Sequence, residues 1–453
     1  MRNSTPYCLL CVVCVCGVNL SAATAKPNFV LLLADDLGYA DVSCFGNKRF
    51  TTPNIDALAA RGLKFTDFHA NGAVCSPTRA ALMTGRYQQR AGIPTVVYAD
   101  PTKNRNHGLQ ATEITLADLL RKDGYATGIF GKWHLGYEKQ YNPTHHGFDV
   151  FRGYVSGNVD YFSHVDGAGF ADWWDGTELA DEPGYTTHLI TRHAIEFIEA
   201  NKDRPFFLYV PFEAVHAPYQ GPNDKALRRV GEKEQAARGN VETAYREMDQ
   251  EMDKGIGEIV AALDRLHLAE NTLVIFTSDN GGVKNEYNIP LRGTKGTLWE
   301  GGHREPAAFV WPGRIKPGQS TAQTALTMDL LPTLCELAGA STPTDRKIDG
   351  VSLVPVLMNN RPLPQRTVFW EYARQRAARQ GPWKLLLNET QPGGKGKKIR
   401  GTVPPVELFN LDDDLSETKN LADQHPDRVA AMRQAVEDWE KDVSTGATHQ
   451  PEK

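Results

Sequence analysis

The chain has few cysteines and no large excess of charge of either sign. Seven cysteines occur in 453 residues, and four of them lie in the first 25 residues. Cys44, Cys75 and Cys335 remain, an odd and sparse set that excludes a disulfide framework. The formal net charge is −5. This disfavours nucleic acid as a partner, because polyanion binding requires an excess of basic residues.

Long apolar runs are also missing beyond the N-terminus. Arg2 precedes an apolar run from Tyr7 to Leu20, and small residues follow it up to Ala25. This pattern is typical of a secretory signal, and the run is short for a membrane span. We therefore expect residues 1–25 to be a cleavable signal peptide, the mature chain to be secreted or periplasmic, and no stable membrane span. An uncleaved anchor is the alternative.

In its other proportions the whole chain is typical of a globular protein, with 41% hydrophobic and 23% charged residues. Short apolar runs predict buried strands over 28–34, 127–130, 206–210 and 273–277. Helical patterns alternate with them, over about 52–62, 115–122, 187–200 and 242–266. Strands that alternate with helices predict an α/β fold with a large, mostly parallel sheet sandwiched by helices.

Polar side chains follow each of these predicted strands. They are Asp35 and Asp36, Lys132 and His134, His216, and Asp279 and Asn280. One such cluster alone is more typical of a solvated turn. Ligands of parallel sheets bind beyond the carboxyl ends of the strands, so the repetition favours a single polar site at one edge.

The segment from Val74 to Arg86 contains one of the three remaining cysteines at a predicted helix start. Pro77 suits the first turn of a helix that runs toward Thr84. Free backbone N–H groups and the helix dipole favour an anion near Cys75. Taken by itself, Cys75 is either a reactive thiolate or a small buried residue.

Two stretches resemble the signature sequences of the sulfatase family. The first, Cys-x-Pro-x-Arg followed by x-x-Leu-x-Thr-Gly, runs from Cys75 to Gly85, and the second runs from Gly124 to His134. The resemblance continues at 35–36, 216–218, 279–281, 295–302, 407–411 and 420–422. The segment 293–306 is most similar to the arylsulfatase A and N-acetylgalactosamine-6-sulfatase types. The resemblance implies the alkaline phosphatase-like fold, with a smaller C-terminal domain of antiparallel sheet plus helix.

The resemblance also implies a modified nucleophile. In this family the motif cysteine is oxidised during export to formylglycine by a formylglycine-generating enzyme, and Cys75 is the matching position. One hydroxyl of the hydrated aldehyde attacks sulfur and expels the alcohol. The second hydroxyl then loses its proton, and sulfate is released, which divides one difficult displacement into two easier steps.

The metal ligands follow from the types of side chain. Asp35, Asp36, Asp279 and Asn280 offer hard oxygen atoms, which suit Ca²⁺ or Mg²⁺ better than zinc. The resemblance favours one Ca²⁺, with the modified Cys75 contributing to its coordination.

The resemblance assigns the other site residues. Arg79 would fix the hydrate, Lys132 and Lys295 would bind sulfate oxygens, His134 would act as base, and His216 would protonate the leaving alcohol. Three further residues are candidates for substrate contact. Ser156 matches a family serine through a loose local pattern, and His303 lies beside a glycine pair, where it is either a loop residue or a substrate contact. Trp173 would either stack on a sugar ring or anchor its loop.

The domain organisation follows from composition and motifs. We predict a catalytic domain over 26–341, a Pro-rich crossover linker over 342–366, a C-terminal α+β subdomain over 367–443 and a disordered tail over 444–453. In the subdomain, strands are expected at 368–372, 383–387 and 407–411, and a helix at 426–442. A basic segment at 393–401, extended by Arg374, Arg376 and Arg379, would either grip a sulfated polysaccharide or form a solvated connection.

The sequence therefore predicts an exported sulfatase that acts on sulfate monoesters, with a sulfated carbohydrate or an aryl sulfate as substrate. Two alternatives stay open. The same fold could hydrolyse phosphate or phosphonate esters, or the protein could bind sulfated glycans without catalysis if Cys75 is unmodified.

Overall fold

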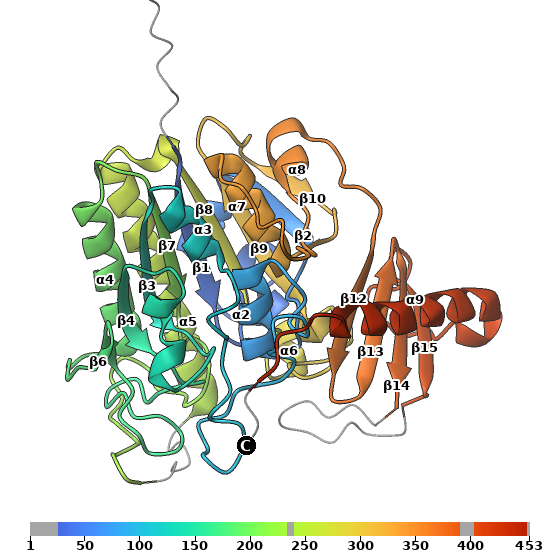
Figure 1. The fold of residues 1–453 in the computed structure, drawn as a ribbon, viewed down its shortest axis with the longest axis horizontal. Helices are drawn as coiled ribbons and strands as arrows, with labels where there is room; N and C mark the ends of the chain where they lie inside the picture. The colour runs from blue at the N-terminus through green and yellow to red at the C-terminus, as the bar shows by residue number, and fades with distance from the viewer. Residues whose placement is uncertain (1–25, 233–239, 390–402, 451–453) are drawn as a thin grey trace, which may run out of the picture.

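The computed structural model describes residues 26–232, 240–389 and 403–450. The predicted signal peptide, at 1–25, and the basic segment at 393–401 lie outside the described residues. The chain forms a large α/β unit and a smaller unit beside it, each built on its own β-sheet (Figure 1). Within the described part of the chain, no helix combines the length and apolar character that crossing a membrane requires.

The described strands of the large unit form one mixed sheet. They are β1 (Asn28–Ala34), β2 (Leu63–His69), β3 (Ala126–Lys132), β4 (Val150–Tyr154), β5 (Trp174–Asp175), β6 (Glu178–Leu179), β7 (Phe206–Pro211), β8 (Thr272–Ser278), β9 (Arg304–Val310), β10 (Gln319–Thr321) and β11 (Ala325–Leu326). Their order is β10-β2-β9-β8-β1-β7-β3-β4-β5-β6, and β11 also pairs with β2. The central run from β8 to β4 is parallel, which confirms the predicted mostly parallel sheet.

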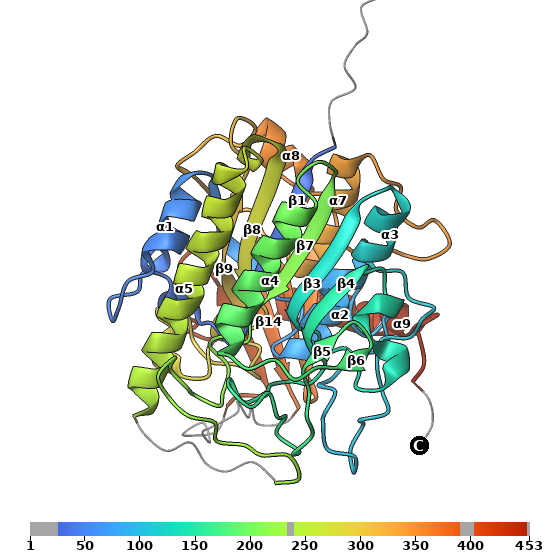
Figure 2. The ribbon, with the colours of Figure 1, turned by 90° about the vertical axis from the view of Figure 1, so that its left-hand side faces the viewer.

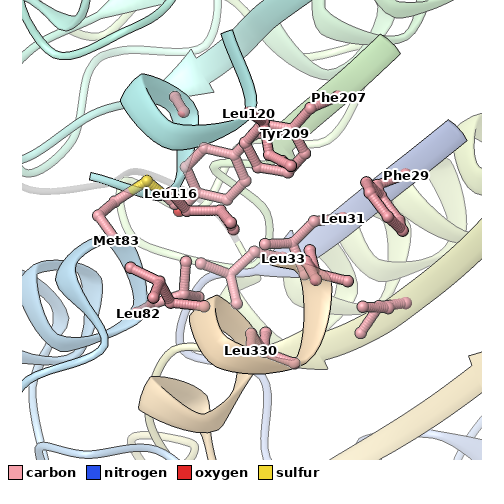
Figure 3. Close-up of a cluster of buried hydrophobic side chains, with 14 of the residues drawn as sticks. Phe29, Leu31, Leu33, Leu82, Met83, Leu116, Leu120, Phe207, Tyr209 and Leu330 are labelled. Carbon is pink, nitrogen blue, oxygen red and sulfur yellow. The ribbon is translucent and has the colours of Figure 1, made fainter. Parts of the chain in front are cut away.

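Helices cover both faces of this sheet, because its central strands are apolar on both sides. The α-helices among the described residues are α1 (Pro53–Ala60), α2 (Cys75–Thr84), α3 (Leu116–Lys122), α4 (Thr186–Ala200), α5 (Val241–Arg265), α6 (Asn285–Asn288), α7 (Leu330–Ala338), α8 (Val354–Asn359) and α9 (Pro426–Ser444). On one face, Leu31 and Leu33 of β1 pack with Leu82 of α2 and Leu116 of α3 (Figure 3). On the other face, Leu32 packs with residues of α4 and α5, which Figure 2 shows in front of the sheet.

The small unit is an antiparallel sheet with one long helix against it. Its strands are β12 (Thr367–Tyr372), β13 (Gln375–Gln380), β14 (Trp383–Asn388) and β15 (Val406–Asn410), in that order. Met432 and Val436 of α9 pack against Leu385 and Leu408. The sequence predicts three of these strands and not β13, because Gln-Arg-Ala-Ala-Arg-Gln contains none of the β-branched or aromatic residues that mark a strand.

Two predictions about the C-terminal part of the chain are wrong, namely that Arg376 and Arg379 extend a basic patch and that the tail is disordered. Arg379 does not extend a basic surface patch, because it is buried and its Nη1 contacts Oδ1 of Asp67 at 2.6 Å. Arg376 on the same strand pairs with Glu389 and Glu440. The tail is also ordered up to residue 450. The amide of Gly108 donates to the Gln450 side chain at 3.0 Å, so this segment lies on the large unit.

Candidate active site

Four neighbouring strands of the large sheet end at one edge, and polar residues lie there. β8, β1, β7 and β3 are adjacent and parallel, so their carboxyl ends meet. The polar residues at these ends are, strand by strand, Asp279 and Asn280, Asp35 and Asp36, His216, and Lys132 and His134. The structure thus brings together side chains that are up to 245 positions apart in the chain.

Cys75 begins α2 at this edge. Val74 before it is extended, with φ −151°, so the helix starts at the cysteine. The Cys75 sulfur lies 3.6 Å from Oδ1 of Asp35 and 3.3 Å from Nζ of Lys295, and the residue is 2% exposed. Burial raises the pKa of the Cys75 thiol to about 11, although Lys132 and Lys295 act in the opposite direction. Cys75 is therefore a neutral thiol, which is a weak nucleophile.

Three buried cations pair with three buried carboxylates around the sulfur. The pairs are Lys132 with Asp35, at 2.5 Å between Nζ and Oδ2, Lys295 with Asp36, and Arg79 with Asp279, at 2.8 Å between Nη2 and Oδ2. The formal charges of these six groups cancel. A divalent cation in the cluster would leave a positive charge and would favour the binding of an anion.

Atoms that could ligate a metal gather around Cys75. One atom from each of Asp35, Asp36, Cys75 and His216 lies within 4.8 Å of the others. Nδ2 of Asn280 donates to Asp36 at 2.8 Å, whereas its Oδ1 is buried and finds no hydrogen-bond partner among the described residues. A buried oxygen without a partner is costly, and a cation would satisfy it. The donors are mostly hard oxygens, which suit Ca²⁺ or Mg²⁺.

The pKa values of two carboxylates of this group are shifted in opposite directions. Burial would raise the pKa of Asp36, but nearby cations, chiefly Lys295, hold it below its ordinary value. Burial, and then repulsion from Asp35, raises the pKa of Asp279. The carboxylates therefore repel one another, and a divalent cation among them would relieve this repulsion.

Two histidines adjoin the cluster. Nε2 of His134 lies 2.9 Å from the carbonyl oxygen of Val97, so we assign the ring hydrogen to Nε2 and leave Nδ1 as a proton acceptor. Nδ1 of His216 lies 2.6 Å from the carbonyl oxygen of Ala217, and its Nε2 lies 3.5 Å from Oδ2 of Asp36. Burial lowers the pKa of both His134 and His216 well below the ordinary value.

Ser156 and Trp173 do not present free side chains to the cluster. The hydroxyl of Ser156 donates to the carbonyl oxygen of Asn158 at 2.9 Å. Trp173 is 2% exposed and stacks on His164 with ring centroids 4.5 Å apart, while its Nε1 donates to Glu182. Trp173 is thus a packed anchor of its loop, the second of the two interpretations that the sequence left open, and not a platform for a sugar ring.

His303 also lies away from the cluster. It is fully buried beneath the small sheet, where its ring stacks on Trp370 with centroids 4.3 Å apart. Its Nδ1 lies 3.0 Å from Nδ1 of His69. Because His303 has no accessible surface, its assignment as a substrate contact is wrong.

The structure adds Glu305, which the sequence analysis missed. This second residue of β9 is fully buried, and neither carboxylate oxygen has a hydrogen-bond partner in the described part of the chain. Burial raises its pKa well above the ordinary value, and the nearby Asp279 and Asp36 add to this effect. A glutamate directly before the apolar run 306–310 was the available signal.

Comparison with family models finds two matches along the chain. The model described as Sulfatase matches residues 27–340. The model described as N-sulphoglucosamine sulphohydrolase, C-terminal, matches residues 294–442, a range that includes the small unit.

Curated relatives and solved structures agree with these matches. The chain is 37% identical over 380 residues to N-acetylgalactosamine-6-sulfatase of Homo sapiens, covering 78% of this chain and 70% of that protein. It is 36% identical over 466 residues to arylsulfatase A of Homo sapiens, covering 91% and 87%. The crystal structure of Ps i-CgsB superposes with a TM-score of 0.80 and 31% identity over 94% of this chain and 95% of that one. Ps i-CgsB has also been solved in complex with k-i-k-neocarrahexaose, at the same TM-score, identity and coverage.

Proposed function

The chain belongs to the sulfatase family and is a sulfuric ester hydrolase, and from this premise we propose that it hydrolyses sulfate monoesters of carbohydrates, using a formylglycine made from Cys75 and one bound Ca²⁺. The observation that carries the proposal is the position of the Cys75 sulfur, between the ammonium group of Lys295 and the carboxylate of Asp35. A nucleophile made at this position would lie beside both a cation that can bind sulfate and the ligands of a metal.

The residues around Cys75 fit the proposed Ca²⁺. Asp35, Asp36, Asp279 and Asn280 would hold it, and the unpartnered Oδ1 of Asn280 supports this assignment. The bound ion would supply Lewis acidity that polarises a sulfate oxygen.

Cys75 fits conversion to formylglycine better than catalysis as a thiol. Its sulfur is buried and its raised pKa keeps it protonated, so it is a weak nucleophile as it stands. Formylglycine would supply a hydrated aldehyde with one hydroxyl for attack on sulfur and a second for release of sulfate. The N-terminal end of α2 carries a partial positive charge that favours the negative charge of the reacting groups.

Two of the three cations would bind and orient the sulfate group, and the third would hold the nucleophile in place. Lys132 and Lys295 are compact charges at the centre of the cluster, and both can contact the oxygens of an anion. Arg79 lies one helical turn from Cys75 and would fix the hydrate. Stabilisation of the charge that develops on the sulfate oxygens is the largest effect that such cations supply.

The two histidines would move protons. Nδ1 of His134 is the free acceptor of that ring, so this atom would take the proton from the second hydroxyl, which remains after the first has attacked sulfur. Nδ1 of His216 donates to the carbonyl oxygen of Ala217, so Nε2 is the ring nitrogen that would first take up a proton and then pass it to the leaving alcohol oxygen. Protonation of the leaving oxygen matters most for a sugar sulfate, because a sugar alkoxide leaves poorly.

Carbohydrate sulfates are the proposed substrate class because one similar protein is named for a saccharide and another has been solved in complex with one. One is N-acetylgalactosamine-6-sulfatase, and the other, Ps i-CgsB, has been crystallised with a neocarrahexaose. We also propose that the chain is exported through the segment at residues 1–25 and that a formylglycine-generating enzyme acts on it during export.

The proposal is tested with the full chain produced with and without a formylglycine-generating enzyme. Mass analysis of the peptide that contains residue 75 should show loss of the sulfur only in the co-produced sample. Only that sample should hydrolyse 4-nitrophenyl sulfate, and Cys75→Ala should abolish the hydrolysis. Cys44→Ser is the matched control, because Cys44 is a half-buried cysteine outside the cluster, and its activity should be retained.

Two results would contradict the proposal. Faster hydrolysis of 4-nitrophenyl phosphate than of the sulfate would support a phosphate or phosphonate esterase. An intact cysteine in material from the native source, together with binding of a sulfated oligosaccharide, would support the non-catalytic binding protein.

A further inference from the structure

The backbone of the segment 292–303, here called the Lys295 loop, contacts two of the segments that form the cluster. The amide of Lys295 donates to the carbonyl oxygen of Gly282 at 3.1 Å, just beyond Asn280. The amide of Gly296 donates to the carbonyl oxygen of Ala73 at 2.8 Å, two residues before the nucleophile position. The position of this loop therefore fixes Lys295 relative to both the metal ligands and Cys75.

The end of the loop also packs closely against the segment that follows β8. The amide of Gly281 donates to the carbonyl oxygen of Gly302 at 3.2 Å. A Cβ atom on Gly281 would lie 2.0 Å from the carbonyl oxygen of Gly301, and one on Gly302 would lie 2.0 Å from that of Thr297. Only glycine permits this approach of the backbones, so a shift of the loop would be transmitted to the cluster.

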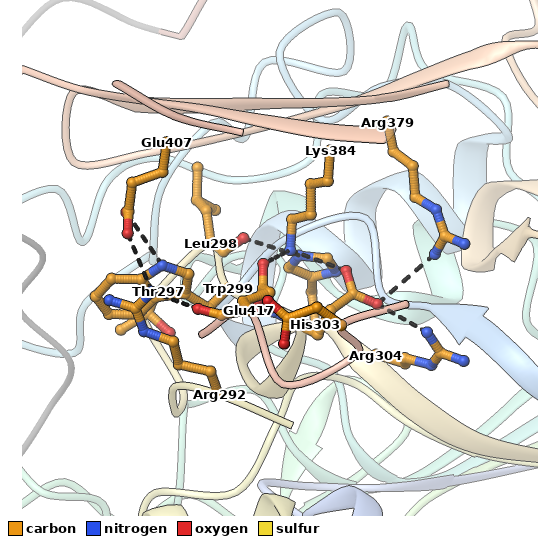
Figure 4. A network of polar contacts seen from close by, with 12 residues as sticks. Arg292, Thr297, Leu298, Trp299, His303, Arg304, Arg379, Lys384, Glu407 and Glu417 are labelled. Atoms are coloured by element: carbon orange, nitrogen blue, oxygen red, sulfur yellow. Dashed lines mark hydrogen bonds and ion pairs between the residues drawn. The ribbon is translucent and has the colours of Figure 1, made fainter. Parts of the chain in front are cut away.

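A lysine of the small sheet holds the far side of the loop (Figure 4). Nζ of Lys384, on β14, lies 2.8 Å from Oε1 of Glu300 in the loop and 3.0 Å from Oε1 of Glu417. Oε2 of Glu417 accepts a hydrogen bond from the backbone amide of Glu300 at 2.7 Å. All three side chains are fully buried, so the ammonium group links two carboxylates in a region of low dielectric.

A second set of contacts holds the start of the loop. Nη1 of Arg292 donates to Oε1 of Glu407 on β15 at 3.0 Å and to the carbonyl oxygen of Glu417 at 2.8 Å. The guanidinium group of Arg292 lies 4.0 Å from the ring centroid of Trp299, whose Nε1 donates to Glu407 at 3.3 Å. The small sheet therefore contacts the loop on both sides of Lys295.

This network contains side chains of the types that can bind a metal, but ion pairs already occupy their charged atoms. His69, Glu300 and His303 present atoms within 4.8 Å of one another. The ammonium of Lys384 already contacts Glu300 and lies 3.3 Å from Nε2 of His303. Arg304 contacts the other oxygen of Glu300 at 3.0 Å, so two cations already fill the position that a metal would need.

We propose that Lys384 is a positioning residue: through Glu300 and Glu417 it holds the Lys295 loop in place, so that the C-terminal unit contributes to sulfate binding and turnover without touching the substrate. Loss of the Lys384 charge would leave two buried carboxylates without their shared partner. The loop would then move away from the small sheet and carry Lys295 out of register with residue 75. The inference rests on the proposed function only for the identity of the anion that Lys295 binds.

The experiment compares Lys384→Met with Lys384→Arg and with Arg376→Met, all in the full, matured chain. Arg376→Met is the matched control, because Arg376 lies on the neighbouring strand and pairs with Glu389 and Glu440 away from the loop. With 4-nitrophenyl sulfate, kcat/KM should fall about 10- to 100-fold in Lys384→Met, since small misplacements of a binding group have effects of this size. Lys384→Arg should recover part of this loss, and Arg376→Met should stay within about twofold of the parent.

A double-variant cycle separates positioning from general damage. If Lys384 acts through Lys295, adding Lys384→Met to Lys295→Ala should cause little further loss of kcat/KM. An equal loss in both backgrounds would overturn the proposal. If Lys384→Met does not fold, Glu417→Gln, which keeps the size of the side chain, should give a smaller loss that again disappears in the Lys295→Ala background.

A crystal structure of Lys384→Met, or of Glu417→Gln if the former does not fold, gives a readout that does not depend on turnover. We expect Nζ of Lys295 to move by about 1 Å or more relative to residue 75, and the affinity for inorganic sulfate to fall. An unmoved Lys295 would overturn this inference while leaving the proposed function intact. A parent protein that hydrolyses no sulfate ester would overturn the proposed function, whereas the movement of Lys295 would still decide the positioning role.

Discussion

Arg79 donates two hydrogen bonds to a single carboxylate oxygen of Asp279, from Nε at 3.0 Å and from Nη2 at 2.8 Å, although 200 positions separate the two residues. Both side chains are almost completely buried. The third guanidinium nitrogen, Nη1, donates to the carbonyl oxygen of Lys132 at 2.8 Å. One side chain of α2 thereby joins the ends of β8 and β3.

Arg79→Met should therefore destabilise the protein and abolish activity. Removal of one partner of a buried ion pair leaves the other charge uncompensated, which costs about 3–5 kcal/mol. Chemical denaturation would measure this free energy of unfolding. Arg61→Gln is the control, because Arg61 forms an exposed pair with Asp264 and its loss should cost at most about 1 kcal/mol. Equal effects of the two substitutions would contradict the structural role of Arg79.

Removal of divalent cations should destabilise the protein by an amount that grows with the logarithm of its affinity for Ca²⁺. At a free Ca²⁺ concentration 100 times the dissociation constant, binding adds about 2.7 kcal/mol to the stability. The thermal midpoint should fall on chelation and recover with added Ca²⁺. Asn280→Ala should reduce this response, whereas Asn410→Ala at the end of β15 should not. A thermal midpoint that chelation does not change would argue against the metal site.

His216→Ala should impair substrates according to their leaving groups. General acid catalysis contributes about 10²- to 10⁴-fold when the leaving oxygen is a poor one. We expect a loss of this order in kcat/KM for a sugar sulfate and a much smaller loss for 4-nitrophenyl sulfate, whose phenolate needs little protonation. His188→Ala, on the exposed side of α4, should change neither rate. An equal loss for both substrates would exclude His216 as the acid.

His146 should make the protein less stable as the pH falls below neutrality. Burial, and then the neighbouring His145, lowers the pKa of His146 from 6.5 to about 4. Between these values the unfolded chain binds a proton that the folded protein does not. Stability therefore rises with pH in this window and is lost as the pH falls, by up to about 3 kcal/mol at pH 4.

The difference between the parent and His146→Phe isolates this contribution. Phenylalanine keeps the ring that packs against Trp133, whose centroid lies 5.6 Å away. Denaturation of both proteins at several pH values from 4 to 7 should show a smaller pH dependence in the variant. Exposed His145 provides the control, since His145→Gln should keep most of the pH dependence of stability that the parent shows. Parallel curves for parent and His146→Phe would show that this residue does not titrate as described.

The sequence predicts those elements whose signal is local. The strands at β1, β3, β7 and β8 are apolar runs, and the helices at α1, α3, α4 and α5 have apolar periodicity with starts and stops that neighbouring residues supply. The gathering of polar residues at the strand ends is also predictable, because the carboxyl ends of parallel strands in one sheet lie at the same edge. β13 has no such signal, and pairing with β12 and β14 makes it a strand.

The sequence by itself determined the α/β architecture and the residues that gather at the edge of the sheet. Only the tertiary structure decided which polar residues are buried and what each one contacts. His303 and Trp173 lie in stretches that look like loops in the chain, yet both are buried, and His303 stacks on Trp370, which is distant in sequence. Lys384 carries no motif, and its place between Glu300 and Glu417 arises only when the small sheet docks on the large unit. The physical reason is that burial and pairing of charge depend on segments far apart in the chain, whereas periodicity and turn chemistry depend on neighbours.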